Sequence, residues 1–144
     1  MKVMVLVKAT AATEAGQMPT EAEFQAMGAF NAQLVEAGIM LAGEGLHPTS
    51  RGRRVVFGGE RPQVIEGPFT ATTELVAGFW LWQVRSLDEA TEWLKRAPFG
   101  PQDVVEIRPV FSEEDLGDTF TPELRAQEQR LRDRLDNDNQ GERA

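Results

Sequence analysis

A short β-rich run that ends on an acid and is stopped by Gly-Pro most constrains the fold of this chain. Val64 and Ile65 favour an extended strand, and Glu66 stands at its end. Gly67-Pro68 then ends the strand, because proline has no backbone N–H to donate to a sheet ladder. Phe69 gives the following turn an apolar anchor. The segment therefore predicts a carboxylate at the mouth of a sheet, held by a rigid turn.

Extended and helical patterns alternate along the rest of the chain. Thr20 and Ser86 each open a capping box, with a glutamate three residues later, and therefore predict two helix starts. Gly38 is a natural stop for the first helix, and Pro98 limits the second. Strands are predicted at 3–8, 39–46, 54–57, 63–65, 76–84 and 104–110. The order β-α-β, hairpin, β-α-β is typical of an α+β, ferredoxin-like fold with an inserted hairpin.

The predicted sheet has more apolar surface than two helices can cover. Met4 and Leu6 alternate with the valines of the first strand, and Trp80 and Trp82 alternate with other apolar residues of the fifth. A wet sheet face should instead be polar. We therefore expect a homodimer that buries a sheet face including Trp80 or Trp82.

Size, charge and residue types narrow the class of protein. The chain has 144 residues, no cysteine and a net charge of −8. The acidity argues against a nucleic-acid partner, which requires a basic face. No apolar run reaches membrane-spanning length, and the strand-like start does not resemble a secretory signal. We expect a cytoplasmic protein with no membrane partner.

The last part of the chain differs from the rest. Residues 112–144 hold ten acidic and five basic residues, for a net charge of −5. Thr121-Pro122 predicts a helix start, with proline at the first helical position. We expect a ferredoxin-like domain at 1–111 and an acidic helical extension at 112–144, disordered from Asp136 onward. The predicted helix carries a narrow apolar stripe of Leu124, Leu131 and Leu135.

Several segments, in order, resemble the YCII-related or DGPF-domain family. Glu66-Gly67-Pro68-Phe69 resembles the signature turn of that family, and Glu74 resembles the acid after it. The resemblance implies a fold similar to the dimeric α/β-barrel superfamily, in which two sheets pack face to face around a cleft. It names no reaction, because this is largely a family of unassigned function. Further matching segments are Met1-Lys2-Val3-Met4, Gly43-Glu44-Gly45-Leu46-His47-Pro48, Gly78-Phe79-Trp80, Ser86-Leu87-Asp88-Glu89-Ala90 and Glu106-Ile107-Arg108-Pro109-Val110.

The chain also departs from the family pattern. Glu66 replaces the usual aspartate, and Ala71 and Thr73 stand where an acid and a lysine are usual. YciI-type members are thought to use a His–Asp pair with the histidine on the first helix. Residues 20–37 contain no histidine, so this pair cannot be carried over.

Two residues are candidates for proton transfer. Glu66 could act as a general acid or base in a dry cleft, or it could accept backbone N–H bonds and hold its own turn. His47 is the only histidine; it could be the proton-transfer partner near neutral pH, or an exposed loop residue. Both are our predicted catalytic residues.

Other residues are candidates for substrate binding. Arg51, Arg53 and Arg54 could hold a substrate carboxylate, or they could be a solvated charge run. Glu106 and Arg108 share a strand face and could line the cleft or pair with each other. We add Glu74, from the family pattern, and Trp80, which could stack on a planar ligand or lie in the core or an interface.

We therefore carry two hypotheses. One histidine, no cysteine and no HExxH pattern predict no metal site, and the absence of a glycine-rich phosphate loop predicts no cofactor. The first hypothesis is a dimer that binds a small organic molecule in its cleft, as a cofactor-independent acid–base enzyme of an acidic or phenolic substrate. The second is a non-catalytic dimeric module that binds a ligand or a protein.

Overall fold

The computed structural model describes residues 1–70 and 74–141, and it divides the chain into two compact units, Met1–Val110 and Phe111–Ala144. No helix among these described residues is long and apolar enough to cross a membrane.

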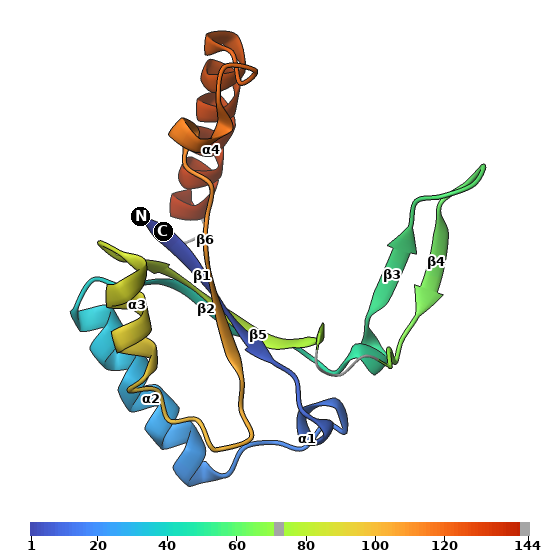
Figure 1. Ribbon diagram of the computed structural model, residues 1–144, viewed down its shortest axis with the longest axis vertical. Helices are drawn as coiled ribbons and strands as arrows, with labels where there is room; N and C mark the ends of the chain where they lie inside the picture. Colours follow the sequence, from blue (N-terminus) through green and yellow to red (C-terminus); the bar gives the residue numbers. More distant parts are fainter. Residues whose placement is uncertain (71–73, 142–144) are drawn as a thin grey trace. The chain divides into compact units, whose positions relative to one another are not determined.

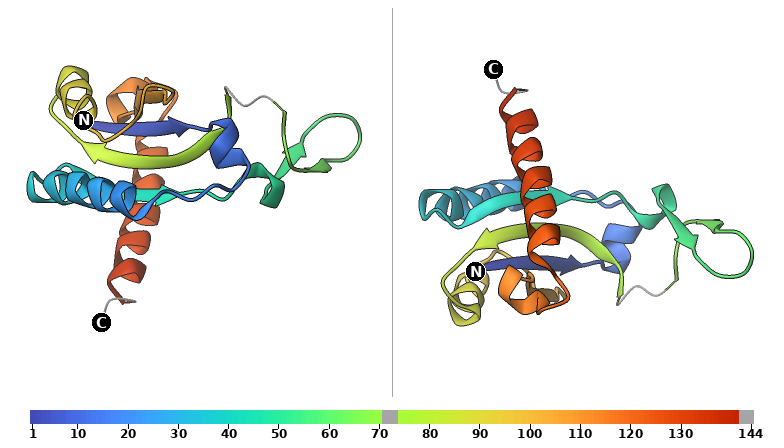
Figure 2. Two further views of the ribbon diagram at one scale, coloured as in Figure 1. Left: turned by 90° about the horizontal axis from the view of Figure 1, so that it is seen from below. Right: turned by 90° about the horizontal axis from the view of Figure 1, so that it is seen from above.

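The first unit is built on a four-stranded sheet of β1 (Lys2–Lys8), β2 (Met40–Gly45), β5 (Val76–Gln83) and β6 (Val105–Pro109). The strand order is β2-β5-β1-β6, and every neighbouring pair is antiparallel. Figure 2 shows β1 and β5 side by side with their arrows in opposite directions. With α2 (Glu21–Glu36) between β1 and β2, and α3 (Leu87–Leu94) between β5 and β6, this arrangement confirms the predicted ferredoxin-like α+β fold.

In chain order α2 precedes β2, and the hairpin is inserted between β2 and β5. Strands β3 (Arg53–Val56) and β4 (Gln63–Glu66) form this separate two-stranded sheet, visible apart from the main sheet in Figure 1. A short helix, α1 (Ala11–Glu14), lies where the sequence predicts only a loop. It is capped by Thr10 and Thr13, whose hydroxyl oxygens accept each other's backbone N–H. This reciprocal Thr–Thr pair differs from the usual capping box, in which the second residue is a glutamate or glutamine.

The two long helices begin at the predicted caps. The Thr20 hydroxyl accepts the backbone N–H of Glu23, and the Glu23 carboxylate accepts that of Thr20, which completes the capping box. The Ser86 hydroxyl likewise accepts the N–H of Glu89. The Glu89 carboxylate instead binds Arg85, whose side-chain hydrogen bond is the main reason that the pKa of Glu89 is lowered.

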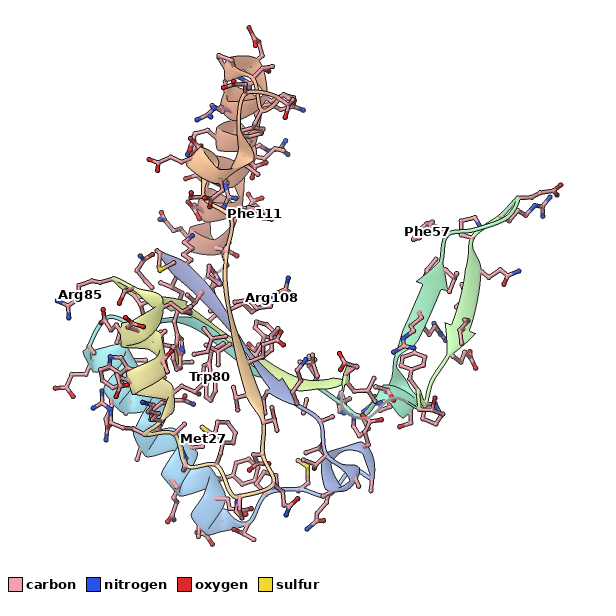
Figure 3. The ribbon with its side chains drawn as sticks, viewed as in Figure 1. Met27, Phe57, Trp80, Arg85, Arg108 and Phe111 are labelled. Atoms are coloured by element: carbon pink, nitrogen blue, oxygen red, sulfur yellow. The ribbon has the colours of Figure 1, made fainter. Side chains whose placement is uncertain are left out.

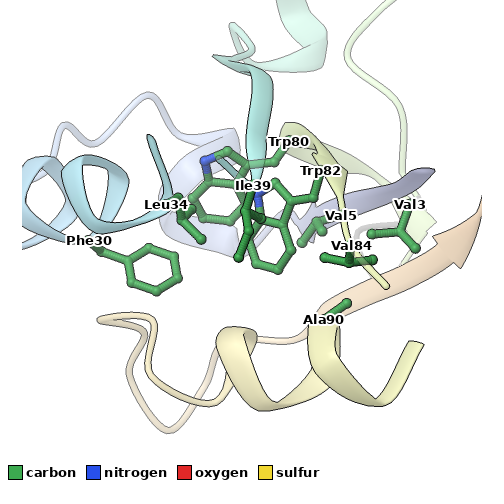
Figure 4. Close-up of a cluster of buried hydrophobic side chains, with 9 residues drawn as sticks. All are labelled: Val3, Val5, Phe30, Leu34, Ile39, Trp80, Trp82, Val84 and Ala90. Atoms are coloured by element: carbon green, nitrogen blue, oxygen red, sulfur yellow. The ribbon is translucent and has the colours of Figure 1, made fainter. Parts of the chain in front are cut away.

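Both helices cover one face of the sheet, and the core lies between the helices and that face (Figure 4). Val3 pairs with Trp82 and Val5 with Trp80 across β1 and β5, so all four side chains point to this face. Trp82 is fully buried, and Trp80 is 5% exposed. Figure 3 shows Trp80 near Met27 of α2, among the side chains under the helices. The cluster comprises Val3, Val5, Phe30, Leu34, Ile39, Trp80, Trp82, Val84 and Ala90.

This position corrects one sequence prediction. Trp80 and Trp82 do not belong to a free sheet face; they form the hydrophobic core of a single chain. Their β-strand parity matches that of the buried valines, and large aromatic rings are what two helices need to fill the space above a small sheet. The opposite face carries the alternate residues of the same strands.

We call that opposite face the open face, and its apolar residues are Met4, Leu6, Phe79 and Leu81. All four are half-buried in the single chain. Neither α2 nor α3 covers them, because both helices pack against the core face. The open face therefore keeps an apolar centre, as predicted from Met4 and Leu6.

The second unit contains a 3₁₀ turn, Glu113–Leu116, and helix α4 (Pro122–Gly141). The helix begins at the predicted proline but continues past Asp136, where the sequence predicts disorder. Extending an existing helix is far less costly than starting one, so polar residues can prolong it. A salt bridge between Arg132 and Glu128 and a hydrogen bond from Gln129 to Asp133 span successive turns. No residue of α4 is buried.

We expect Asn31→Ala to lower the free energy of unfolding by about 1–3 kcal/mol, because it leaves a buried donor unpaired. The indole N–H of Trp80 donates to Oδ1 of Asn31 at 3.0 Å. Chemical denaturation of the purified protein measures this loss. Gln33→Ala, an exposed amide on the same helix, is the matched control and should change stability little. Equal effects of the two variants would contradict a role for this hydrogen bond.

Candidate functional site

The structure distributes the predicted site residues over three places. Glu66, His47 and the three arginines lie at the base of the hairpin. Glu74, Glu106 and Arg108 lie toward the open face, and Trp80 lies in the core. The predicted residues thus do not form a single cleft within one chain.

The turn after Glu66 is held by a hydrogen-bond relay that begins on α1. The Glu14 carboxylate accepts the backbone N–H of Thr49 at 3.1 Å and the Thr49 hydroxyl at 2.6 Å. The oxygen of that hydroxyl accepts the backbone N–H of Phe69 at 3.0 Å. The backbone N–H of Gly67 donates to the carbonyl oxygen of Gly52 at 3.0 Å. Glu14 therefore holds the turn. The sequence had suggested Glu66 for this structural role, as the alternative to a catalytic one.

Glycine is required at position 67 by a close approach of backbone. A side-chain carbon there would overlap the carbonyl oxygen of Thr49. The chain on one side of the turn is thus packed directly against the 3₁₀ turn (Thr49–Arg51) on the other. This contact explains Gly67 as a packing requirement.

A cavity of about 580 Å³ opens at the hairpin base, and Arg51, Arg53 and Glu66 line it together with Ser50, Gly52 and Gly67. The Glu66 carboxylate lies 3.7 Å from Nε of Arg53, and their side chains are 77% and 69% exposed. Nη1 of Arg51 lies 3.2 Å from both ring nitrogens of His47, which is exposed and does not line the cavity. Arg54 stacks on the Phe69 ring, with 3.9 Å from its guanidinium carbon to the ring centroid.

These contacts limit what the hairpin base can do chemically. Glu66 is solvated and paired with a guanidinium, so it lacks the dry surroundings that tune a carboxylate for acid–base work. Arg51 and Arg53 present guanidinium groups suited to carboxylates. Within a single chain, the hairpin base resembles an anion-binding surface more than a catalytic centre.

A second cavity, of about 510 Å³, lies at the end of β1 and β6, and we call it the Lys8 cavity. Lys8 Nζ lies 3.8 Å from Oε1 of Glu106, and the Lys8 side chain is only 16% exposed. Glu74 also lines the cavity, as do Thr10 and Gln102. Glu106 stands opposite Leu6 in the β1–β6 ladder, so this cavity adjoins the open face.

Lys8 was not among the residues that the sequence predicted for the site. One signal was present: Lys8 ends an otherwise apolar strand and shares the parity of Met4 and Leu6. A lysine at that place is directed to the edge of an apolar face. The pairing of β1 with β6, which brings Glu106 to it, is a tertiary contact that no sequence pattern specifies.

The remaining predicted residues are placed as follows. Arg108 is exposed on β6 opposite Met4, and it shares a strand face with Glu106 as predicted. Trp80 borders an apolar slot of about 370 Å³ between α2, β2 and β5, where its indole N–H binds Asn31. Among residues 1–70 and 74–141, no cluster of three or more histidine, aspartate or glutamate side chains is arranged to hold a metal ion.

Comparison with known proteins identifies a family and finds distant structural similarity. The YCII-related domain matches residues 1–114. A solved structure of 5-chloro-2-hydroxyhydroquinone dehydrochlorinase (TftG) from Burkholderia phenoliruptrix AC1100, in complex with 2,5-dihydroxybenzoquinone, is similar at 14% identity and a TM-score of 0.39. That match covers 80% of this chain and 99% of the other. No curated protein matches the sequence.

We expect Glu14→Ala to destabilise the protein by about 1.5–3 kcal/mol, because charge-assisted hydrogen bonds to Thr49 are lost. Glu66→Ala removes only an exposed ion pair and should cost less than about 1 kcal/mol. Thermal and urea unfolding of the two variants gives the comparison directly. If Glu66→Ala proved the more damaging change, Glu66 rather than Glu14 would hold the turn.

Proposed function

This chain belongs to the YCII-related family, and from that premise we propose that it binds a small organic anion in the Lys8 cavity, at the edge of a cleft between two copies of the chain. The single observation that carries the proposal is the position of Lys8. Its side chain is only 16% exposed and borders a cavity of about 510 Å³ beside an apolar sheet face.

Lys8 suits the recognition of a single anionic oxygen. An ammonium group has three N–H donors, and the contact with Glu106 at 3.8 Å is an ion pair too long for a hydrogen bond. Donors therefore remain for a ligand carboxylate or phenolate. Thr10 and Gln102, at the same cavity, offer further polar groups to orient it.

The apolar residues of the open face suit the rest of such a ligand. Leu6 lies next to the Lys8 cavity through its pairing with Glu106, and Phe79 lies opposite Leu6 on β5. Small-molecule sites typically combine apolar walls with a few placed polar groups. A second copy packed on the open face would close these walls over the ligand and would bury Met4 and Leu81.

Binding is better supported than acid–base catalysis by Glu66 and His47. Both of these side chains are exposed at the hairpin base, and each contacts an arginine. Neither lines the Lys8 cavity. An enzyme built on them would need surroundings that a single chain does not provide, whereas the Lys8 cavity already has a cation, polar partners and an apolar border.

We expect benzoate to bind the protein and the neutral analogue benzyl alcohol to bind much more weakly, because only the carboxylate pairs with Lys8. Saturation-transfer NMR of each compound with the whole protein measures this difference. Lys8→Met keeps the length of the side chain and should abolish the preference for benzoate. Lys95→Met, which removes an exposed lysine at the C-terminal cap of α3, is the matched control. Unchanged benzoate binding to Lys8→Met would exclude this site.

Light scattering should give about twice the chain mass of 16.0 kDa, because the open face needs a cover. Leu81→Asp places a charge at the centre of that face and should shift the protein to monomers. Val35→Asp, on the exposed side of α2, is the control and should leave the mass unchanged. Circular dichroism checks that both variants are folded. A wild-type protein that remains monomeric at micromolar concentration would refute the dimer.

A further inference from the structure

The charges that line the Lys8 cavity are not balanced. The lining includes one basic side chain, Lys8, and two acidic ones, Glu74 and Glu106, and its other residues are uncharged. A ligand that is only an anion therefore adds its charge to a lining that is already acidic. Like charges placed close together oppose binding. The lining favours a ligand that also brings a positive charge.

The two carboxylates come to the cavity from opposite sides of β1. Glu106 belongs to β6, which pairs with one edge of β1. Glu74 lies two residues before β5, which pairs with the other edge. The backbone N–H of Ala9 donates to the carbonyl oxygen of Leu75 at 2.8 Å, and this bond holds the segment next to Glu74 against the chain after Lys8. Lys8 thus belongs to the strand that lies between those of the two acids.

Only one of the two acids has a partner within the chain. Oε1 of Glu106 lies 3.8 Å from Nζ of Lys8, so part of its charge is compensated there. Glu74 is exposed, and it takes part in no salt bridge within the part of the chain that the structure describes. An exposed carboxylate gains only modestly from a charged partner. Glu74 is therefore suited to select among ligands, while Lys8 supplies the main charge contact.

From these observations we propose that the ligand of the Lys8 cavity is an organic acid that also carries an ammonium group. Its carboxylate pairs with Lys8, and its ammonium group pairs with Glu74. The inference rests on the proposed function, because it assigns the chemical class of ligand for the same site. Amino acids and aminomethyl-substituted aromatic acids belong to this class. The cavity, of about 510 Å³, falls within the usual size range of small-molecule sites.

Ligands with a single charge satisfy only one end of this arrangement. A cation suits Glu74, but it brings a like charge toward Lys8, which has three N–H donors and no acceptor. An anion suits Lys8, but it leaves the carboxylate of Glu74 without a partner. A compound with both charges, on separate groups, satisfies each end and is held in one orientation.

Two compounds of similar shape provide the probes. At neutral pH, para-(aminomethyl)benzoate carries both a carboxylate and an ammonium group, whereas para-ethylbenzoate carries the carboxylate alone. Saturation-transfer NMR titrations with the whole protein give the two dissociation constants. Since the compounds also differ in hydration, the informative quantity is the ratio of these constants, compared between the natural chain and its variants.

We expect Glu74→Gln to shift this ratio about two- to five-fold against para-(aminomethyl)benzoate, which is the usual contribution of one exposed ion pair. The affinity for para-ethylbenzoate should not fall. High salt should reduce the effect, because exposed charges are screened. Glu92→Gln, at an exposed glutamate of α3 outside the cavity, is the matched control and should leave the ratio unchanged. An unchanged ratio in Glu74→Gln, with circular dichroism showing folded protein, would overturn the inference.

Lys8→Met separates this inference from the proposed function. If neither compound binds the natural protein, or if both bind Lys8→Met as well as the natural protein, the proposed function is wrong and the inference fails with it. If binding of both compounds requires Lys8 but Glu74→Gln leaves the ratio unchanged, the ligand site stands and only the ammonium group is wrongly assigned. Loss of binding in Lys8→Met together with the shifted ratio in Glu74→Gln would support both.

Discussion

A four-stranded sheet has two faces, and the helices α2 and α3 of this chain cover only one of them. Burial of apolar area is the main favourable term in folding, so the covered face takes the largest side chains. Trp80 and Trp82 fill the space between the sheet and the helices, and the pairing of β1 with β5 places the valines beside them. The alternate residues of the same strands point to the other face of the sheet and form a smaller apolar set. The open face, and with it the environment of Lys8, follows from this asymmetry.

The conformation of the Glu66–Phe69 turn has a structural explanation in this chain. Glu14 holds Thr49, Thr49 holds the backbone of Phe69, and Gly67 permits the close approach of the two segments. The acid of the turn, Glu66, takes no part in this relay and remains at the surface beside Arg53. The rigid part of this turn orients the hairpin base and leaves the charged residues there free to meet a partner or ligand.

The proposed ligand site rests on a surface that a single chain leaves incomplete. The Lys8 cavity adjoins an apolar sheet face that neither α2 nor α3 covers. A second copy of the chain packed on this face would close the site. The structure divides the chain into two compact units after Val110. The assignment of 1–111 as a ferredoxin-like domain and of 112–144 as an extension stays a prediction.

Local patterns of the sequence determined most of the secondary structure. Capping signals placed the starts of α2, α3 and α4, and alternation placed the strands, because both depend on residues within a few positions of each other. The ferredoxin-like order followed from the succession of these elements. Alternation also showed that Phe79 and Trp80 lie on opposite faces. It could not show which face the helices cover, so the tryptophans were assigned to an interface when they belong to the core.

Only the tertiary structure decided which charged residues meet. Lys8 and Glu106 are distant in sequence and come together through the β1–β6 ladder. Glu14 likewise meets Thr49, although helix α2 and strand β2 separate them in the sequence. The same pairing of strands separates Glu74 and Glu106 from Glu66 and His47, which the sequence analysis had combined in one site. Register and chain packing determine such meetings, and both arise from burial summed over the whole unit. A short motif specifies the conformation of its own backbone, but the partners of its side chains depend on where the rest of the chain packs.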